Sequence, residues 1–159
     1  MMRIGVGFDS HPLATGRRLI IGGVEIPFDK GLTGHSDADV LSHAIADALL
    51  GAMGEGDLGT YFPDTDSTYE GISSQKILRK VLGILLEKRH RIVNIDSTLF
   101  AERPKLAPHV EEMRQALSSA LDIPTTSISV KATTMEKMGF VGREEGIAAV
   151  AVALLEDMA

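Results

Sequence analysis

The chain has 159 residues, of which 44% are hydrophobic, and its formal net charge is −6. This length suits one domain over residues 1–159 with a sizeable core. The acidic balance argues against a general binder of nucleic acid or of anionic membranes. No apolar run is long enough to cross a bilayer, and the N-terminus lacks the apolar segment of a secretory signal, so we expect a cytoplasmic protein. The chain has no cysteine, so metal ligands would have to be His, Asp or Glu.

Hydrophobic periodicity predicts the elements in chain order, beginning with a strand over residues 3–8. Residues 18–27 are typical of a β-hairpin that turns at Gly22-Gly23. The remaining expectations are helices over 38–53, 73–89 and 109–121 and strands over 92–100, 128–134 and 146–155. This mixed order favours an α+β fold, with a mixed β-sheet, helices packed on one face and a β-hairpin insertion.

Two of the predicted strands carry further expectations. In 92–100, the alternation places Val93, Ile95 and Leu99 on one face. The last strand, 146–155, is apolar on both faces and must be covered on both. The second cover is either the rest of the same monomer, around a central strand, or another subunit.

The stretch GFDSH places Asp9 and His11 two residues apart, directly after the first predicted strand. In an extended chain these side chains point to the same face, where a carboxylate and an imidazole could bind one metal ion. A surface pair, or an Asp that orients a His, explains the same spacing.

The predicted helix 38–53 supplies a third candidate ligand, His43. Ser36 is a suitable N-cap, with Asp37 and Asp39 in the first turn. Asp47 lies four residues after His43 on the same helix face and could hold its ring, although a core His satisfied by its own Asp fits as well. With Asp9 and His11, His43 makes the three-ligand pattern of a reactive zinc site.

Three further stretches have groups suited to a phosphorylated ligand. His35 and Ser36 precede a helix, where free N–H groups bind anions or are simply capped. Asp57 and Asp64 lie in a Gly/Asp loop that could bind sugar hydroxyls or be an ordinary loop. Residues 131–146 combine threonines, cations and Glu136, which suit phosphate and a hard divalent ion, or a solvated loop.

These stretches together resemble the 2-C-methyl-D-erythritol 2,4-cyclodiphosphate synthase family, almost from end to end. The matching blocks are GFDSH (7–11), IIGGVEIP (20–27), GHSDADVLSHAIADALLGA (34–52), GDLGTYFPDTD (56–66), RPKLAPH (103–109) and KATTMEKMGFVGREEGIA (131–148). So many ordered blocks at compatible spacing make the resemblance far more specific than any one motif.

The resemblance implies an enzyme that cyclises 4-diphosphocytidyl-2-C-methyl-D-erythritol 2-phosphate and releases CMP. It implies zinc on Asp9, His11 and His43, a second divalent ion (Mg²⁺ or Mn²⁺) on Glu136, and catalytic roles for His35, Thr134 and Glu136. The implied substrate contacts are Asp9, His11, His35, Ser36, Asp57, Gly59, Phe62, Asp64, Ala101, Pro104, Lys105, Leu106, Ala132, Thr133, Thr134, Phe140 and Arg143.

The resemblance also implies a homotrimer, with the sheets toward the threefold axis and active sites between adjacent subunits. Some members have a Glu at the position of Val150. In those members the Glu and the equivalent of Arg143 belong to a cavity along the trimer axis that can hold an isoprenoid diphosphate. This sequence keeps Arg143 and Phe8, but Val150 removes a polar group, so the resemblance does not decide whether its cavity binds that ligand. Two other readings are a zinc phosphatase or phosphodiesterase, and a trimeric binding protein with a structural metal.

Overall fold

The computed structural model describes residues 1–158. Its main sheet has five strands in the order β4-β1-β7-β5-β6, and only β5 and β6 run parallel. The strand bounds are Met2–Thr15 (β1), Lys30–Leu32 (β4), His90–Phe100 (β5), Ile128–Thr133 (β6) and Gly146–Asp157 (β7). The α+β class with a mixed sheet is therefore confirmed.

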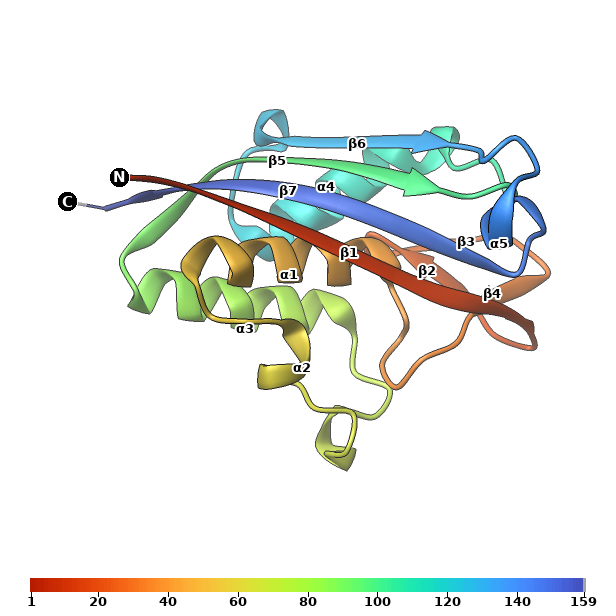
Figure 1. Cartoon of the computed structure of the whole chain (residues 1–159), viewed down its shortest axis with the longest axis horizontal. Helices are drawn as coiled ribbons and strands as arrows, with labels where there is room; N and C mark the ends of the chain where they lie inside the picture. The colour runs from red at the N-terminus through yellow and green to blue at the C-terminus, as the bar shows by residue number, and fades with distance from the viewer. Residues whose placement is uncertain (159) are drawn as a thin grey trace.

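The helices pack against the sheet and one another (Figure 1). The three long helices are α1 (Val40–Met53), α3 (Ser74–Glu87) and α4 (Val110–Leu121). Helix α1 packs on β1 and β7, while α3 and α4 pack together and reach β5 and β6. The short helical segments are α2 (Leu58–Tyr61), η1 (Ser67–Tyr69), η2 (Ala107–His109), η3 (Thr125–Ser127) and α5 (Gly139–Gly142). None of the helices in residues 1–158 is long and apolar enough to cross a bilayer.

Two glycines let β1 and α1 approach backbone to backbone. A Cβ added to Gly5 would lie 2.1 Å from the carbonyl oxygen of Ala48, and one added to Gly7 would lie 2.0 Å from that of Ala44. Real side chains do not tolerate such distances, so only glycine fits at either position. This close packing positions the first turn of α1, with His43, beside the strand residue Asp9.

The two faces of the sheet differ sharply. On β7, Ile147, Ala149, Ala151, Ala153 and Leu155 are buried under the helices. The opposite face exposes five large apolar side chains: Met2 (57%), Ile4 (72%), Val6 (68%), Phe8 (59%) and Val152 (37%). The apolar last strand is thus central in the sheet, yet the helices of this chain cover only one of its faces. We call these five residues the open face.

Several expected boundaries are wrong. The first strand runs on to Thr15, so Asp9 and His11 lie within it. Helix α1 begins at Val40 with Asp39 as N-cap, not Ser36, so Asp37 and Asp39 precede the helix. Tertiary contacts explain the shift, because the buried Asp39 carboxylate accepts from the backbone N–H groups of Gly22 and Gly23 as well as Ser42.

The expected face of the fifth strand is also wrong in part. The pairing of β5 with β7 shifts between Ile92 and Asn94, so Val93 drops out of register. Ile92 is buried instead, together with Ile95 and Leu99. Earlier in the chain, β2 (Leu19–Ile21) and β3 (Val24–Ile26) pair antiparallel across the Gly22-Gly23 turn.

Candidate active site

Asp9, His11 and His43 converge on one point. Asp9 Oδ2 lies 2.8 Å from His11 Nε2 and 3.0 Å from His43 Nδ1, and the two ring nitrogens are 3.2 Å apart. Asp9 and His11 point to one face of β1, as their spacing predicts, and α1 brings His43 to them. One carboxylate oxygen and two imidazole nitrogens are suitable donors for a divalent metal with one open position, so these residues form a metal-binding triad.

Neighbouring groups turn both rings toward the triad. His11 Nδ1 lies 3.0 Å from the carbonyl oxygen of Thr33, which can only accept, so Nδ1 donates there and Nε2 is the nitrogen that faces the triad. His43 Nε2 lies 2.8 Å from Ser74 Oγ and 3.0 Å from Ser36 Oγ. Sequence reasoning missed Thr33 and Ser74, because no local pattern links them to histidines more than 20 residues away.

Asp47 does not hold His43. Its carboxylate accepts a 2.7 Å hydrogen bond from the backbone N–H of Leu58, at the start of α2, and burial raises its pKa. The four-residue spacing correctly places Asp47 and His43 on the same helix. The ring of His43, however, turns its outer nitrogen toward the first residue of α3, and a pattern within α1 gives no sign of that.

The triad is strongly coupled electrostatically. Burial raises the pKa of Asp9, but hydrogen bonds from His11 and His43 outweigh it and hold that pKa well below the usual range. Burial lowers the pKa of His11, but the hydrogen bond and charge of Asp9 outweigh it, and the net direction is upward. A metal ion bound here would replace the protons that lie between the Asp9 carboxylate and the two imidazoles, because all three groups bind a metal in their deprotonated forms.

A hollow of about 120 Å³ adjoins the triad, and we call it the metal hollow. Its lining includes predicted site residues His35, Ser36, Phe62 and Asp64, and Leu58, Tyr69, Ile72 and Ile77 complete the wall beside His11 and His43. The loop between α2 and α3 closes one side, where His35 Nε2 lies 3.2 Å from the carbonyl oxygen of Asp66. The ring of Phe62 meets that of Tyr69 edge to face, 5.3 Å between centroids.

Two predicted substrate contacts do not line this hollow. Asp57 is the N-cap of α2, and its carboxylate accepts from the backbone N–H and the hydroxyl of Thr60, at 3.0 and 2.9 Å. Gly59 lies within α2. Their contact with substrate stays a prediction.

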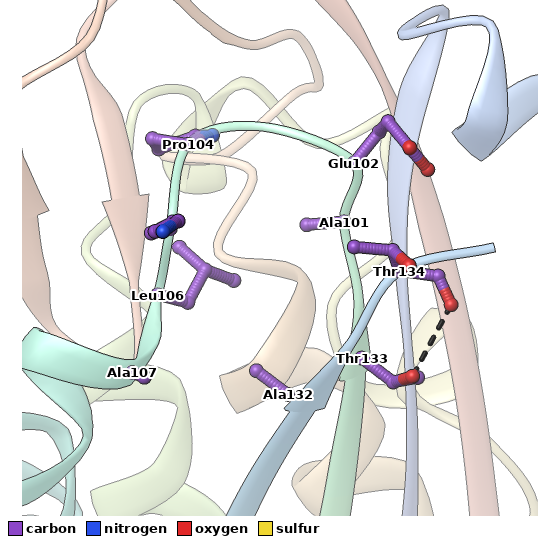
Figure 2. Close-up of a pocket in the computed structure, with 9 residues that line it drawn as sticks. Ala101, Glu102, Pro104, Leu106, Ala107, Ala132, Thr133 and Thr134 are labelled. Carbon is purple, nitrogen blue, oxygen red and sulfur yellow. Dashed lines mark hydrogen bonds between the residues drawn. The ribbon is translucent and has the colours of Figure 1, made fainter. Parts of the chain in front are cut away.

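A second hollow, of about 160 Å³, lies where the parallel strands β5 and β6 end, and we call it the strand-end hollow. Figure 2 shows the segment after β5 arching along one side, with Ala132–Thr134 along the other. It brings together all seven residues predicted there: Ala101, Pro104, Lys105, Leu106, Ala132, Thr133 and Thr134. Glu102 and Ala107 also line it, and both lie in the 101–107 segment that the resemblance implies for the cytidine pocket. Five of its nine lining residues are alanine or threonine.

The turn after β6 carries Glu136. Thr134 Oγ1 donates to Glu136 Oε1 at 3.3 Å, so the predicted catalytic pair is in contact. Glu102 accepts from the backbone N–H groups of Met135 and Lys137, at 3.3 and 3.4 Å, and thereby holds the turn beside the hollow. No spacing in the sequence indicates this contact, because Glu102 lies more than 30 residues away.

Phe140 and Arg143 lie apart from both hollows. Phe140 lines a third hollow, of about 310 Å³, with Ser10, His11, Pro12, Glu145 and Gly146. The guanidinium of Arg143 donates to both carboxylate oxygens of Glu145, at 2.9 and 3.1 Å.

Known proteins resemble the chain over nearly its whole length. The curated 2-C-methyl-D-erythritol 2,4-cyclodiphosphate synthase of Chloroherpeton thalassium is 58% identical over 155 residues, which cover 98% of this chain and 99% of that protein. The protein of the same name from Bacillus subtilis is 54% identical, with the same coverage.

Solved structures agree. The Plasmodium falciparum IspF CDP complex matches with a TM-score of 0.88 and 33% identity, covering 99% of this chain and 97% of that one. The bifunctional IspDF of Campylobacter jejuni matches with a TM-score of 0.96 and 39% identity, over 99% of this chain and 43% of the longer protein. The model of the YgbB family matches residues 2–156. With its triad, its hollows and these matches, the chain belongs to the YgbB family.

Proposed function

We infer that the chain converts 4-diphosphocytidyl-2-C-methyl-D-erythritol 2-phosphate into 2-C-methyl-D-erythritol 2,4-cyclodiphosphate and releases CMP. It is a lyase of non-mevalonate isoprenoid biosynthesis, the activity for which its relatives are named. The observation that carries this conclusion is the triad of Asp9, His11 and His43. Two of its members, His11 and His43, line the metal hollow together with His35 and Ser36.

We propose that the triad holds zinc and that Glu136 contacts a second divalent ion, Mg²⁺ or Mn²⁺. Two such ions supply positive charge to the phosphates and polarise their oxygens. The triad fits zinc because its donors are two imidazole nitrogens and one carboxylate oxygen, with room for a ligand oxygen. Glu136 offers only oxygen, which suits the harder ions.

The reaction needs no general base from the chain. A phosphate monoester is mostly dianionic at neutral pH, since its second pKa is about 6. One oxygen of the 2-phosphate attacks the β-phosphorus of the diphosphate, a new P–O bond forms, and the bond from that phosphorus to CMP breaks. The work of the protein is positioning and charge stabilisation. Folding the substrate back on itself contributes within the roughly 7–11 kcal/mol known for such orientation effects.

The proposed roles follow the two hollows. His35, Ser36, Asp57, Gly59, Phe62 and Asp64 hold the erythritol phosphate beside the triad. The strand-end hollow takes the cytidine, and the CDP in the name of the Plasmodium structure supports this. Backbone groups of 101–106 and 132–134 read the base at low entropic cost, because Pro104 and Pro108 hold this segment rigid. Thr134 and Glu136 contact the diphosphate. Phe140 and Arg143, which line neither hollow, would reach the substrate only from its edge.

We further propose a homotrimer whose sheets face the threefold axis. The open face supports it, because exposed apolar side chains on one sheet are typical of a surface covered by another chain. Each active site then joins the metal hollow of one copy to the strand-end hollow of the next. The two hollows share no lining residue, which suits this arrangement.

Residues 1–159 form one domain in this proposal, supported by a hydrophobic core that draws on the main sheet and the long helices. A cytoplasmic location suits the charged, water-soluble substrate.

Product analysis tests the proposed function. The metal-loaded chain is incubated with the substrate and followed by ³¹P NMR, beside a sample treated with a chelator and a third to which zinc and magnesium are returned. We expect CMP and a cyclic diphosphate in equal amounts, lost on chelation and restored by metal. Release of inorganic phosphate instead would make the chain a phosphatase. No turnover with full metal occupancy would favour a binding protein.

A further inference from the structure

His43 is backed by a hydrogen-bonded chain that starts on a different helix. Its Nε2 lies 2.8 Å from Ser74 Oγ, and the same hydroxyl makes a very short contact with Asp37 Oδ1. Asp37 Oδ2 also accepts from the backbone N–H of Ser74 at 2.9 Å. Ser74 is fully buried and His43 nearly so, which shields the hydrogen bond between them from bulk water, while Asp37 at the outer end is partly exposed.

Counting the available hydrogens assigns the donor and acceptor of each hydrogen bond between Asp37, Ser74 and His43. A serine hydroxyl has one hydrogen, and an ionised carboxylate can only accept. The short contact to Asp37 therefore uses the hydrogen of Ser74, and Ser74 Oγ must accept from His43. The ring then carries a proton on Nε2, and Nδ1 is the nitrogen left for the metal. Without metal, Nδ1 shares a proton with Asp9 Oδ2, 3.0 Å away, and a bound metal ion takes the place of that proton.

The same count shows which group can accept the hydroxyl hydrogen of Ser36. Its Oγ lies 3.0 Å from His43 Nε2 and accepts from the backbone N–H of Ala38 at 3.1 Å. Because Nε2 already carries a proton, Ser36 has no acceptor there. Its hydroxyl hydrogen is left for a group in the metal hollow, which Ser36 lines.

We propose that Asp37 and Ser74 are positioning residues for the metal site. They act through His43: they keep a proton on its Nε2 and so present Nδ1 to the metal, and they leave the Ser36 hydroxyl to donate to a phosphate oxygen. The proposal rests on the metal site of the proposed function. Partners of this kind typically contribute 10- to 100-fold to metal affinity.

The chain offers a matched control for Ser74. Ser42 is equally buried, and its hydroxyl also donates to a carboxylate, that of Asp39, at 2.7 Å. No contact joins the Ser42 hydroxyl to the ring of His43 among the described hydrogen bonds. Replacement of either serine by alanine removes one buried hydroxyl bonded to an aspartate, but only Ser74→Ala removes the partner of the ring.

The experiment measures the dissociation constants of Co²⁺ and Zn²⁺ by competition with a chromophoric chelator. Wild type, Ser74→Ala and Ser42→Ala are compared, with the melting temperature of each metal-free chain. We expect Ser74→Ala to bind both ions about 10- to 100-fold more weakly, and Ser42→Ala to stay within about threefold of wild type. Ser74→Cys, nearly equal in size but a weak acceptor, should follow Ser74→Ala and replaces it if the alanine variant does not fold.

A spectroscopic measurement distinguishes a specific effect on the His43 ring from a general loss of stability. In wild type, ¹⁵N-labelled His43 should show a proton on Nε2 that exchanges slowly, and the absorption of bound Co²⁺ should change in Ser74→Ala but not in Ser42→Ala. Equal affinities and equal spectra for the two alanine variants would overturn the positioning role alone. A wild-type chain that binds neither ion in a 1:1 ratio would overturn the metal site and this inference together.

Discussion

The metal hollow and the strand-end hollow are built in different ways. The triad is half-buried, and both of its rings are fixed by hydrogen bonds from distant segments, through Thr33 and Ser74. The strand-end hollow is lined mainly by alanine and threonine residues after two parallel strands (Figure 2), and its side-chain hydrogen bonds hold the turn after β6. In the proposed function, this difference makes the first hollow a preorganised charge site and the second a site that recognises shape. Each should therefore respond to substitutions that leave the other unchanged.

The largest effect is expected from His43→Ala. Loss of one of three ligands should abolish tight metal binding and lower kcat/KM by about 1,000-fold, because metal stabilisation is worth several kcal/mol and each 1.4 kcal/mol is tenfold in rate. Binding of CDP to the strand-end hollow should fall far less. Elemental analysis measures the bound metal, steady-state kinetics measures kcat/KM, and calorimetry measures the affinity for CDP. His109→Ala, outside the triad, serves as the control, and full metal occupancy in His43→Ala would contradict the ligand assignment.

Gly7→Ala tests whether the close approach of β1 and α1 builds the triad. The added Cβ would lie 2.0 Å from the Ala44 carbonyl oxygen, so the free energy of unfolding should fall by about 3 kcal/mol or more. Gly83→Ala is the control: nothing lies within 4 Å of its added Cβ, and alanine is the better helix former, so a gain of up to about 1 kcal/mol is expected. Denaturant unfolding measures both. A Gly7→Ala chain as stable as wild type would show that the approach is not needed.

Ala132→Leu should damage only the strand-end hollow. Ala132 is exposed at the end of β6, and a longer side chain there fills part of a hollow of about 160 Å³ without disturbing the core. We expect about tenfold weaker CDP binding, or roughly 1.4 kcal/mol, with the dissociation constant of zinc unchanged. Calorimetry measures both dissociation constants, and Ser119→Leu, on the exposed face of α4, is the control. If Ala132→Leu binds CDP as wild type does, the nucleotide lies elsewhere.

The smallest effect concerns the outer wall of the metal hollow. Lys80 Nζ lies 4.9 Å from the ring centre of Tyr69 and 5.5 Å from that of Phe62, a cation–π contact worth about 0.5–1 kcal/mol at an exposed site. Lys80→Met should raise KM two- to fivefold with zinc affinity unchanged. Lys76→Met, one turn earlier on α3, is the control. An equal rise in KM for the two variants would assign the effect to lost charge alone.

The parts of this site that sequence predicts are those fixed by local geometry. Spacing in an extended chain placed Asp9 and His11 on one face, and the structure confirms it. The partners of the rings could not be predicted, because Ser74 reaches His43 only through the packing of α3 on α1. The same reason explains two errors: Asp47 bonds to α2 instead of His43, and Asp39 displaces Ser36 as the cap because it also binds the hairpin turn.

The central claim is that one active site combines the metal hollow of one copy with the strand-end hollow of another. Complementation tests it most directly: inactive His43→Ala and inactive Glu136→Ala chains are mixed in equal amounts, and subunit exchange is verified by mass spectrometry. Random mixing in a symmetric trimer leaves about one quarter of the shared sites with neither defect, so about one quarter of wild-type activity should return. If exchange is complete and no activity appears, each site lies within a single chain and the claim is wrong.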